Sequence, residues 1–445
     1  MSQKLLRGFK FLLLIFFTGL YLNACKKPIP SQKFVHVNGD HFEIGNHTYR
    51  FIGANYWEGA YLGANVVPNG KQRLVRELNQ MKNNGITNLR ILASSEKCAI
   101  KRTLTPAFQP KPGVFNQKLF KGLDFLLSEM KKRNMHAVVI LNNYWDWSGG
   151  MPQYVSWSTG TKIPHPIPSG QWEKFMTYSA SFYQDSLAKQ MFRKYIKYVI
   201  TRTNTITGIK YYNDPTIMAW ELANEPRPNP HSLKDTTLLP YFYHWIRNTA
   251  TYIHKLAPQQ LVTTGSEGLV GTLQQKSIFL KEQRSSAINY ITIHIWPKNW
   301  GWYQAVHAKK TFHPSVEKTF HYLDQHINMA KKLNKPLVVE EFGLPRDKEQ
   351  YSRKSPVTYR NRYYSMIFDT LTVEAKHGSP LSGVNFWAFG GEGRPHTSDY
   401  MWKADRIDYT GDPPQEPQGL NSVFSSDTTT LHIVKKYAKR LGSVN

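Results

Sequence analysis

The chain has 445 residues, 40% of them hydrophobic and 13% aromatic, which excludes a mostly disordered protein because disordered chains lack the apolar side chains that a core requires. There are 57 Lys and Arg residues but only 31 Asp and Glu, so the formal net charge is +26. The basic residues are scattered and match no nucleic-acid-binding motif. We therefore expect no nucleic-acid partner and attribute the charge to attraction to an anionic cell surface or to adaptation to the medium.

Residues 1–24 have the layout of an export signal. Three basic residues precede the apolar run 11–22, which is too short for a membrane-spanning helix because such a helix needs about 20 residues. Leu22-Asn23-Ala24-Cys25 then resembles a bacterial lipobox, in which Cys25 is acylated and residues 25–33 form a tether. This pattern predicts an exported lipoprotein that faces the cell surface or the periplasm and meets a membrane only through its lipid. The alternative is an ordinary secretory signal, in which Cys25 is incidental.

From residue 34 onward, strand patterns alternate with helix patterns. Residues 34–51 contain two alternating segments joined by Asn38-Gly39, which predicts a β-hairpin that plugs the bottom of the domain. Buried strands are predicted at 50–56, 88–93, 136–142, 217–225, 261–264, 290–296, 336–342 and 383–389. Amphipathic helices are predicted at 71–84, 116–134, 186–203, 238–256, 316–334, 356–376 and 429–441. The sequence has no glycine-rich phosphate loop, so the alternation predicts one (β/α)8 TIM barrel with long βα loops over 34–445, not an open doubly wound sheet.

The fourth and seventh of these strands end in carboxylates. The fourth belongs to IMAWELANEPR (217–227), where Pro226 ends the strand pairing and leaves Glu225 at the rim. The seventh belongs to KPLVVEEFG, which carries Glu341 near its end. The carboxyl ends of barrel strands are where barrel enzymes keep their chemistry. Cleavage of a glycosidic bond with retention needs two such carboxylates, one to protonate the leaving oxygen and one to attack the anomeric carbon.

Both motifs resemble the catalytic strands of glycoside hydrolase family 5, whose members are (β/α)8 barrels. The resemblance implies that Glu225 is the acid/base, that Asn224 binds the sugar 2-hydroxyl, and that Glu341, directly before Phe-Gly, is the nucleophile. Glu340 points to the opposite side of its strand and is interpreted as structural. Arg90, in NLRILAS, matches the arginine beside the family's nucleophile, where a cation would hold Glu341 ionised.

Three further residues match the family at other strand ends. His294 and Trp296, in HIWP, correspond to the family's His-x-Tyr, and the Trp leaves open how the usual tyrosine contact to the nucleophile is replaced. Trp387, in NFWAFGG, resembles the tryptophan under the sugar at the cleavage subsite. No metal and no cofactor is expected, because the His and carboxylate spacings show no ligand pattern.

The loop 143–170 indicates the substrate. The exit of the third strand into this loop, NNYWDWSGGMPQYVSW (142–157), resembles the mannanase subgroup of family 5, and the late block GDPPQEPQGLNSVFSSDTTT does so too. The resemblance implies a retaining endo-β-1,4-mannanase (EC 3.2.1.78) that acts on mannan, glucomannan or galactomannan. Asn142 and Asn143, where the strand passes into the loop, are candidate substrate-binding residues. Aromatic rings pack against the apolar faces of sugars, so a set of tryptophans is expected to form stacking platforms along the cleft: Trp57, Trp145, Trp147, Trp300 and Trp302.

Three alternatives remain open. Another family 5 β-glycanase, such as a cellulase, or a mannan transglycosylase would use the same carboxylates. A non-catalytic glycan-binding lipoprotein would have lost at least one of them, but both are present in the sequence.

Overall fold

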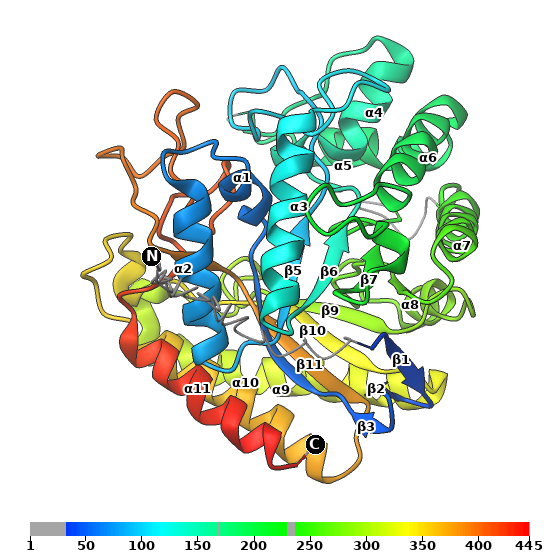
Figure 1. Cartoon of the computed structure of the whole chain (residues 1–445). Helices are drawn as coiled ribbons and strands as arrows, with labels where there is room; N and C mark the ends of the chain where they lie inside the picture. Colours follow the sequence, from blue (N-terminus) through cyan, green and yellow to red (C-terminus); the bar gives the residue numbers. More distant parts are fainter. Residues whose placement is uncertain (1–32, 168, 229–235, 445) are drawn as a thin grey trace, which may run out of the picture. The chain divides into compact units, whose positions relative to one another are not determined.

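The computed structural model describes residues 33–167, 169–228 and 236–444. The predicted signal peptide, the lipobox with Cys25 and nearly all of the tether lie outside these residues. The centre of the described part is an eight-stranded parallel sheet with the spatial order β8-β7-β6-β5-β4-β11-β10-β9 (Figure 1). Its strands are β4 (Phe51–Asn55), β5 (Asn88–Leu92), β6 (His136–Ile140), β7 (Ile217–Glu221), β8 (Leu261–Thr263), β9 (Ile291–Ile295), β10 (Leu337–Phe342) and β11 (Leu381–Phe386).

The two end strands of this sheet, β8 and β9, lie next to each other. Their junction is made by Asn289, whose backbone N–H donates to the carbonyl oxygen of Val262 at 2.8 Å and whose Oδ1 accepts from the N–H of Val262 at 2.7 Å. The sheet is therefore a nearly closed ring, and the predicted (β/α)8 TIM barrel is confirmed. Each observed strand begins and ends within a few residues of its predicted range.

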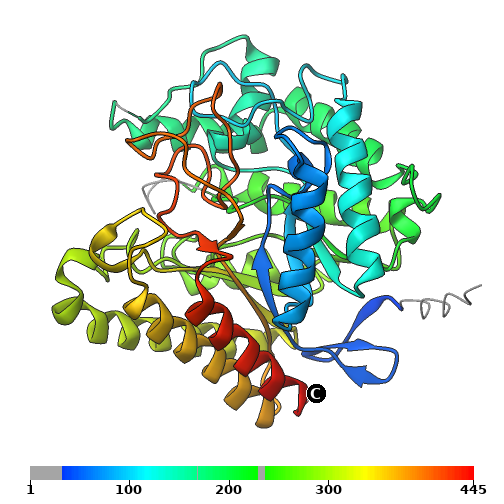
Figure 2. The same cartoon turned by 60° about the vertical axis from the view of Figure 1, so that its left-hand side comes forward.

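Helices surround the barrel (Figures 1 and 2). The predicted ones are present as α2 (Gly70–Asn83), α3 (Gln117–Lys132), α6 (Ser186–Ile200), α7 (Leu239–Leu256), α9 (Ala308–Leu333), α10 (Thr358–Lys376) and α11 (Thr428–Gly442). The prediction was wrong for the start of α9, which includes Pro314 and begins before it. A proline inside a helix removes one backbone hydrogen bond and its ring crowds the carbonyl four residues earlier, which is why the sequence predicted a start after it. Its φ is nevertheless compatible with a helix, and α9 continues through this position.

Additional short helices lie within segments that were predicted as loops. They are α1 (Gly59–Gly63), α4 (Gly150–Thr159), α5 (Trp172–Ala180) and α8 (Lys276–Gln283). These helices have few turns, and α4 begins with a glycine that has φ of +62°, so they lack the long apolar period that reveals an amphipathic helix. Two of them, α4 and α5, follow β6 and shape the loop in which the tryptophans were expected.

The predicted N-terminal hairpin is present as β1 (Val35–Asn38) and β2 (His41–Ile44), and β2 also pairs with β3 (His47–Thr48). Its side chains Val35 and Phe42 belong to a buried cluster with residues from the first halves of the barrel strands or just before them, among them Phe51, Met218 and Tyr290. The hairpin therefore plugs the amino-terminal end of the barrel, as the sequence predicted. The opposite end is left to the βα loops.

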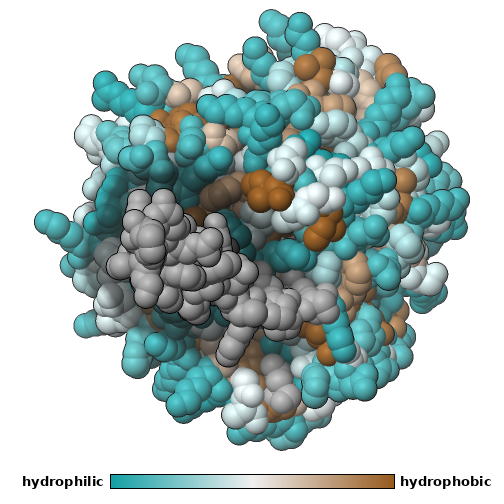
Figure 3. Space-filling view, in the orientation of Figure 1, coloured by the Kyte–Doolittle hydropathy of each residue, from teal (hydrophilic) through white to brown (hydrophobic). Residues whose placement is uncertain are grey.

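Among the helices of the described ranges, we found none that is long and apolar enough to cross a membrane. Hydrophilic residues predominate over the face shown in Figure 3 outside the grey atoms, and hydrophobic residues form only small separate groups there. This face thus offers no broad apolar patch of the kind that marks an interaction surface.

Candidate active site

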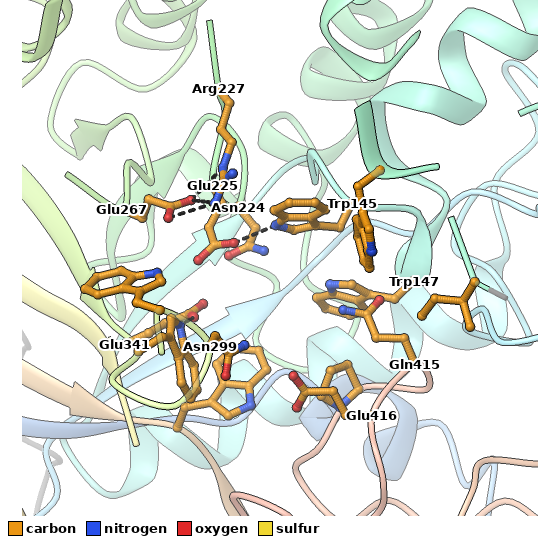
Figure 4. Close-up of a pocket in the computed structure, with 16 residues that line it drawn as sticks. Trp145, Trp147, Asn224, Glu225, Arg227, Glu267, Asn299, Glu341, Gln415 and Glu416 are labelled. Carbon is orange, nitrogen blue, oxygen red and sulfur yellow. Dashed lines mark hydrogen bonds and ion pairs between the residues drawn. The ribbon is translucent and has the colours of Figure 1, made fainter. Parts of the chain in front are cut away.

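A pocket of about 440 Å³ lies at the carboxyl ends of the barrel strands (Figure 4). Its floor and walls combine carboxylates with tryptophan rings. The lining residues are Trp145, Trp147, Ile167, Trp172, Asn224, Glu225, Arg227, Glu267, Trp296, Asn299, Trp300, Glu341, Trp387, Pro413, Gln415 and Glu416. Carbohydrate sites have this composition, because aromatic rings pack on sugar faces while polar groups bind hydroxyls.

Glu225 follows β7 and reaches into the pocket from a backbone with φ of +52°. A left-handed conformation is rare for a non-glycine residue, and such strain concentrates at functional sites. The N–H of Glu225 donates to the carbonyl oxygen of Gly265 at 2.9 Å, which holds this conformation. One carboxylate oxygen accepts from Nε1 of Trp145 at 2.5 Å, and the other lies 2.7 Å from Nδ1 of His294.

Glu341 lies in β10, and its carboxylate is bonded on both sides. One oxygen accepts a short hydrogen bond from Nη1 of Arg90, and the other accepts from Nε1 of Trp296 at 3.1 Å. The indole N–H of Trp296 thus makes the contact to Glu341 that a tyrosine usually makes to the nucleophile in the family, which answers the question that the sequence left open. Oxygens of Glu225 and Glu341 lie within 4.8 Å of each other. Carboxylate oxygens this close suit a retaining pair, whose carboxyl groups are about 5–5.5 Å apart, better than an inverting pair at about 6.5–9.5 Å.

Arg90 is fully buried and binds more partners than the sequence indicated. Besides Glu341, it makes a two-point ion pair with Glu221, in which Nε and Nη2 lie 2.8 and 2.6 Å from the two carboxylate oxygens. Nη2 also donates to Oδ1 of Asn224 at 2.8 Å, and Nη1 to Oδ1 of Asn55 at 3.1 Å. Sequence reasoning missed Glu221 and Asn55. A buried acid within a parallel strand was the available signal for Glu221, because such an acid requires a cation.

The two candidate catalytic carboxyls oppose each other's ionisation. Burial raises the pKa of Glu225, whereas Arg227 lowers it. Burial also raises the pKa of Glu341; Arg90 lowers it, and the charge of Glu225 raises it. Two carboxyls this close share a proton, and the apparent pKa values belong to the pair. Of the two carboxyls, only Glu341 accepts a hydrogen bond from the Arg90 cation, which favours the ionised form of Glu341 and leaves the shared proton on Glu225.

His294 lies between the pair, because its Nδ1 is also 3.3 Å from Oε2 of Glu341. Burial lowers the pKa of His294 to about 4, so the ring is neutral near pH 7. A proton on Nδ1 would be donated to a carboxylate, whereas a proton on Nε2 would leave Nδ1 to accept from protonated Glu225. The same three residues could hold a metal ion by their spacing.

Glu340 does not line the pocket. Its carboxylate is fully buried and has no hydrogen-bond partner within the described residues, although Nε of Arg90 lies 3.7 Å away. Burial raises the pKa of Glu340. Its Oε2 also lies 3.9 Å from Nε2 of His294, so Glu340 reaches the same two side chains, Arg90 and His294, that contact Glu341. The prediction that it points to the opposite side of its strand was therefore wrong, because the pairing of β10 with β9 shifts register between Val339 and Glu341.

Of the three candidate asparagines, one lines the pocket: Asn224. Its Nδ2 donates to Oδ1 of Asn143 at 3.1 Å, and Asn143 is itself buried and donates to Ser148 Oγ at 3.0 Å. Asn142 is also buried, and its Oδ1 accepts from the N–H of Asn143 at 2.8 Å. Direct substrate contact was therefore a wrong prediction for Asn142 and Asn143: Asn143 instead orients Asn224 from behind, and Asn142 binds the backbone of Asn143.

Most of the tryptophans predicted to bind substrate line the pocket, and two do not. Trp145, Trp147, Trp296, Trp300 and Trp387 line the pocket, as does Trp172, which the sequence analysis did not select. Trp302 packs edge-on against Trp300 and is not in the lining. Trp57 is only 1% exposed and lies outside the lining, so the predicted stacking platform at Trp57 is wrong. Its indole N–H donates to the carbonyl oxygen of Gly411 at 2.7 Å.

An ion pair beside Glu225 was also missed. Arg227 donates to both carboxylate oxygens of Glu267 at 2.9 Å each and lies over the ring of Trp145. Burial raises the pKa of Glu267 to about 7. Both residues line the pocket on the side of Glu225, away from Glu341 (Figure 4). Arg227 lies in the motif IMAWELANEPR, but no spacing rule could have placed Glu267 next to it.

The opposite wall comes from the segment 392–422, which connects β12 (Phe389–Gly391) with β13 (Val423–Phe424) and is named the wall segment here. It contributes Pro413, Gln415 and Glu416 to the lining, and Gln415 and Glu416 lie on the side of Trp147 and Asn299 in Figure 4. Burial raises the pKa of Glu416 to about 8. Oε2 of Glu416 has no hydrogen-bond partner in the part of the chain that the structure describes, which leaves an acceptor for a ligand hydroxyl.

Comparisons with known proteins agree with this geometry. A model of "GH family 5 beta-mannosidase-like" proteins matches residues 32–445. The chain is 30% identical to mannan endo-1,4-beta-mannosidase 4 of Solanum lycopersicum over 400 residues, which cover 85% of this chain and 90% of that protein. It is 26% identical to mannan endo-1,4-beta-mannosidase 7 of Arabidopsis thaliana, with 99% and 92% covered.

Solved structures show the same fold. A glycoside hydrolase family 5 mannosidase from Rhizomucor miehei superposes with a TM-score of 0.85 at 35% identity, over 93% of this chain and 99% of that one. A mutant of a family 5 mannosidase from the same organism, solved in complex with mannosyl-fructose, gives a TM-score of 0.84 at 36% identity, over 92% of this chain and 98% of that one.

Proposed function

This chain belongs to glycoside hydrolase family 5, and on that premise we propose that it is a retaining endo-β-1,4-mannanase that hydrolyses internal β-1,4-mannosidic bonds of mannan, glucomannan or galactomannan. The observation that carries the proposal is the separation of Glu225 and Glu341, whose oxygens lie within 4.8 Å of each other. That separation leaves no room for a water between carboxylate and sugar, so the second carboxylate itself attacks.

In the first step, Glu341 attacks the anomeric carbon while Glu225 protonates the departing glycosidic oxygen. Arg90 and the indole N–H of Trp296 hold Glu341 in place and favour its ionised form. Asn224 is held toward the sugar by Arg90 and Asn143. A covalent mannosyl–Glu341 ester results, and the bond to the leaving sugar is broken.

In the second step, Glu225 is ionised because it has given its proton away. It removes a proton from water, the water oxygen attacks the anomeric carbon, and Glu341 leaves as a carboxylate. The product keeps the β configuration. Both carboxyl groups are largely buried. Their electrostatic interactions with the charge that develops on the sugar are therefore stronger than they would be in water.

Proton NMR of the first product is the direct test. Mannan, cellulose and xylan are offered to the purified protein, and the anomeric signal is recorded before mutarotation. We expect release of β-configured products from mannan and little from the other two polymers. An α-configured first product contradicts the retaining mechanism, and equal rates on cellulose contradict the mannan assignment.

A second candidate function is removal of a terminal mannose from short oligosaccharides. The specific observation is the wall formed by Gln415 and Glu416, which closes the pocket on the side away from Glu225 and Arg227. The family model is described as β-mannosidase-like, and the Rhizomucor miehei structure that is 35% identical carries the name mannosidase. Mannopentaose separates the two modes, because internal cleavage gives mannobiose and mannotriose first, whereas terminal cleavage gives mannose and mannotetraose.

We also propose that the protein is exported and anchored by a lipid on Cys25. The support is the sequence alone: basic residues, the apolar run 11–22 and then Leu22-Asn23-Ala24-Cys25. Extracellular mannan is a substrate that an anchored enzyme would meet, and the excess of basic residues would hold it close to an anionic surface.

A further inference from the structure

The wall segment lies beside α1 and α2 in both views, although more than three hundred residues separate Gly411 from Trp57 in the sequence (Figures 1 and 2). Tyr409 of the segment packs against Trp57 and Tyr61, and most of the other contacts between the two regions are buried hydrogen bonds. Arg76 and Glu77 bind Glu392 at the start of the segment, and three residues that take no part in the chemistry hold its middle: Trp57, Glu58 and Arg73. None of the three lines the pocket.

Gly411 is held at both ends of its backbone. Nε1 of Trp57 donates to its carbonyl oxygen at 2.7 Å, and its N–H donates to Oε2 of Glu58 at 2.7 Å. Gly411 has φ of +87°, a conformation that favours glycine. Trp57 and Glu58 are adjacent in the sequence and almost fully buried, so they present a rigid pair of partners to this one peptide.

Arg73 binds the two flanks of the wall segment. Its Nη2 donates to the carbonyl oxygens of Tyr409 at 2.7 Å and Gly390 at 3.2 Å, and Nη1 donates to Asp408 at 2.6 Å. Nε donates to Glu77 at 2.7 Å, so the arginine itself is anchored in α2. Two acceptors of the wall segment, on Asp408 and Tyr409, and one of the preceding strand β12, on Gly390, therefore converge on a single buried guanidinium.

The held peptide is connected to the pocket wall by a short path. Next to Gly411, Oγ1 of Thr410 donates to Oε1 of Gln418 at 2.7 Å. Nε2 of Gln418 donates to the carbonyl oxygens of Pro413 at 3.0 Å and Glu416 at 3.1 Å. The turn that carries Gln415 and Glu416 is thus braced from inside by a side chain that depends on the position of Thr410.

We propose that Trp57, Glu58 and Arg73 are positioning residues that hold Glu416 at the wall of the substrate pocket and so determine how tightly mannosides bind. This inference rests on the proposed function, because Glu416 acts here on a mannoside hydroxyl. The three residues make no contact with the reacting atoms and hold the wall segment, while the ring of Trp57 also packs against Trp147 in the pocket lining. Their contribution belongs to KM and leaves kcat nearly unchanged, because Glu225 and Glu341 are held by other elements.

Trp57→Phe is the sharpest variant, because it removes the indole N–H and keeps an aromatic ring in the core. Arg73 is a poorer choice, since its removal would leave buried carboxylates without a cation and could unfold the protein. The matched control is Trp402→Phe. Trp402 lies in the same segment, is 6% exposed and packs on Tyr409, but its Nε1 has no hydrogen-bond partner among the described residues.

The first measurement needs no substrate. Lys403 and Arg406 are exposed residues of the wall segment and are trypsin sites. Under native conditions, Trp57→Phe should be cut there roughly two- to tenfold faster than wild type, as expected from the loss of one buried hydrogen bond, whereas Trp402→Phe should match wild type. Equal cleavage of Trp57→Phe and wild type would overturn the proposed hold on the segment.

The second measurement is a double-mutant cycle with Glu416→Ala on manno-oligosaccharides. Trp57→Phe should raise KM roughly two- to tenfold with kcat within about twofold, and it should add no further increase in the Glu416→Ala background. Additive effects, or an unchanged KM in Glu416→Ala, would overturn the positioning role. A wild-type protein inactive on every mannoside would refute the proposed function, while the trypsin result would still decide whether the segment is held.

Discussion

Nδ1 of His294 lies 2.7 Å from Oε1 of Glu225, on a ring that is fully buried. The burial lowers the pKa of His294 to about 4, so this contact joins a neutral imidazole to a carboxyl that is protonated for part of the cycle. A neutral ring can exchange donor and acceptor roles through its tautomers. Glu225 therefore keeps a hydrogen-bond partner both before and after it has transferred its proton, while Arg90 holds Glu341.

The two carboxylates are expected to fail in different ways when each is replaced. Glu341→Ala should abolish turnover of all substrates, because no covalent intermediate can form. Glu225→Ala should lose about 10²- to 10⁴-fold on manno-oligosaccharides but spare the first step on activated aryl mannosides, whose leaving group needs no proton. Azide should then accelerate the second step and give a β-mannosyl azide. Labelling by a 2-fluoro-mannoside, located by mass spectrometry, should be found on Glu341; label on Glu340 would reverse the assignment.

The ion pair between Arg227 and Glu267 should set the alkaline limit of activity. Glu225 must be protonated to act as the acid, so activity falls as pH rises through its pKa, which Arg227 lowers. Arg227→Gln should therefore move the alkaline limb of kcat/KM to higher pH. Glu267→Gln removes the carboxylate that balances Arg227 and should move the same limb to lower pH. Shifts of both variants in one direction would show that the pair does not act on Glu225 by charge.

Replacing Glu340 and replacing Arg90 should have opposite effects on the stability of the fold. Burial raises the pKa of Glu340, so its ionisation costs folding free energy as pH rises above the value of an unfolded glutamate. Glu340→Gln should therefore flatten the decline of Tm between about pH 5 and 8. Arg90→Met leaves Glu221 and Glu341 buried without their cation and should cost about 3–5 kcal/mol. Thermal denaturation across this pH range measures both, and a steeper pH dependence in Glu340→Gln would contradict the argument.

The barrel could be predicted because its signal is local. Each strand, such as 336–342, is a continuous apolar run, and each long helix has a regular apolar period. Glu225 and Glu341 could be found for a related reason, since a carboxylate at the end of a buried strand is locally out of place. The positions of Trp57 and Asn142 were mistaken because no local pattern tells a ring or amide at the rim from one buried behind it.

Residues of the site that depend on long-range contact escaped prediction. Glu416 reaches the pocket from the wall segment, which has almost no regular secondary structure and is held by Arg73 and Glu58 from the other end of the chain. Glu267 becomes part of the site only through its pairing with Arg227. Such contacts follow from the closure of the barrel, so they cannot be inferred from spacing along one strand.

The high positive charge should affect adsorption and not turnover. Mannan is neutral and the basic residues are scattered, so screening by salt has no attraction to weaken in the catalytic step. Activity on soluble mannan should change little between low and high ionic strength, whereas binding to anionic lipid vesicles should fall steeply. Strong inhibition of turnover by salt would indicate that the natural substrate carries negative charge.

The lipid anchor is expected to depend on one sulfur atom. Because Cys25 is the residue that a lipobox acylates, a bacterial host grown with a fatty-acid probe should label the wild-type protein and leave Cys25→Ser unlabelled. Cys98→Ser is the matched control, since it removes the only other cysteine and should keep the label. Cell fractionation should place the labelled protein with membranes and the Cys25→Ser protein in the soluble or secreted fraction. Equal label on the wild type and Cys25→Ser would exclude the anchor and leave an ordinary secretory signal.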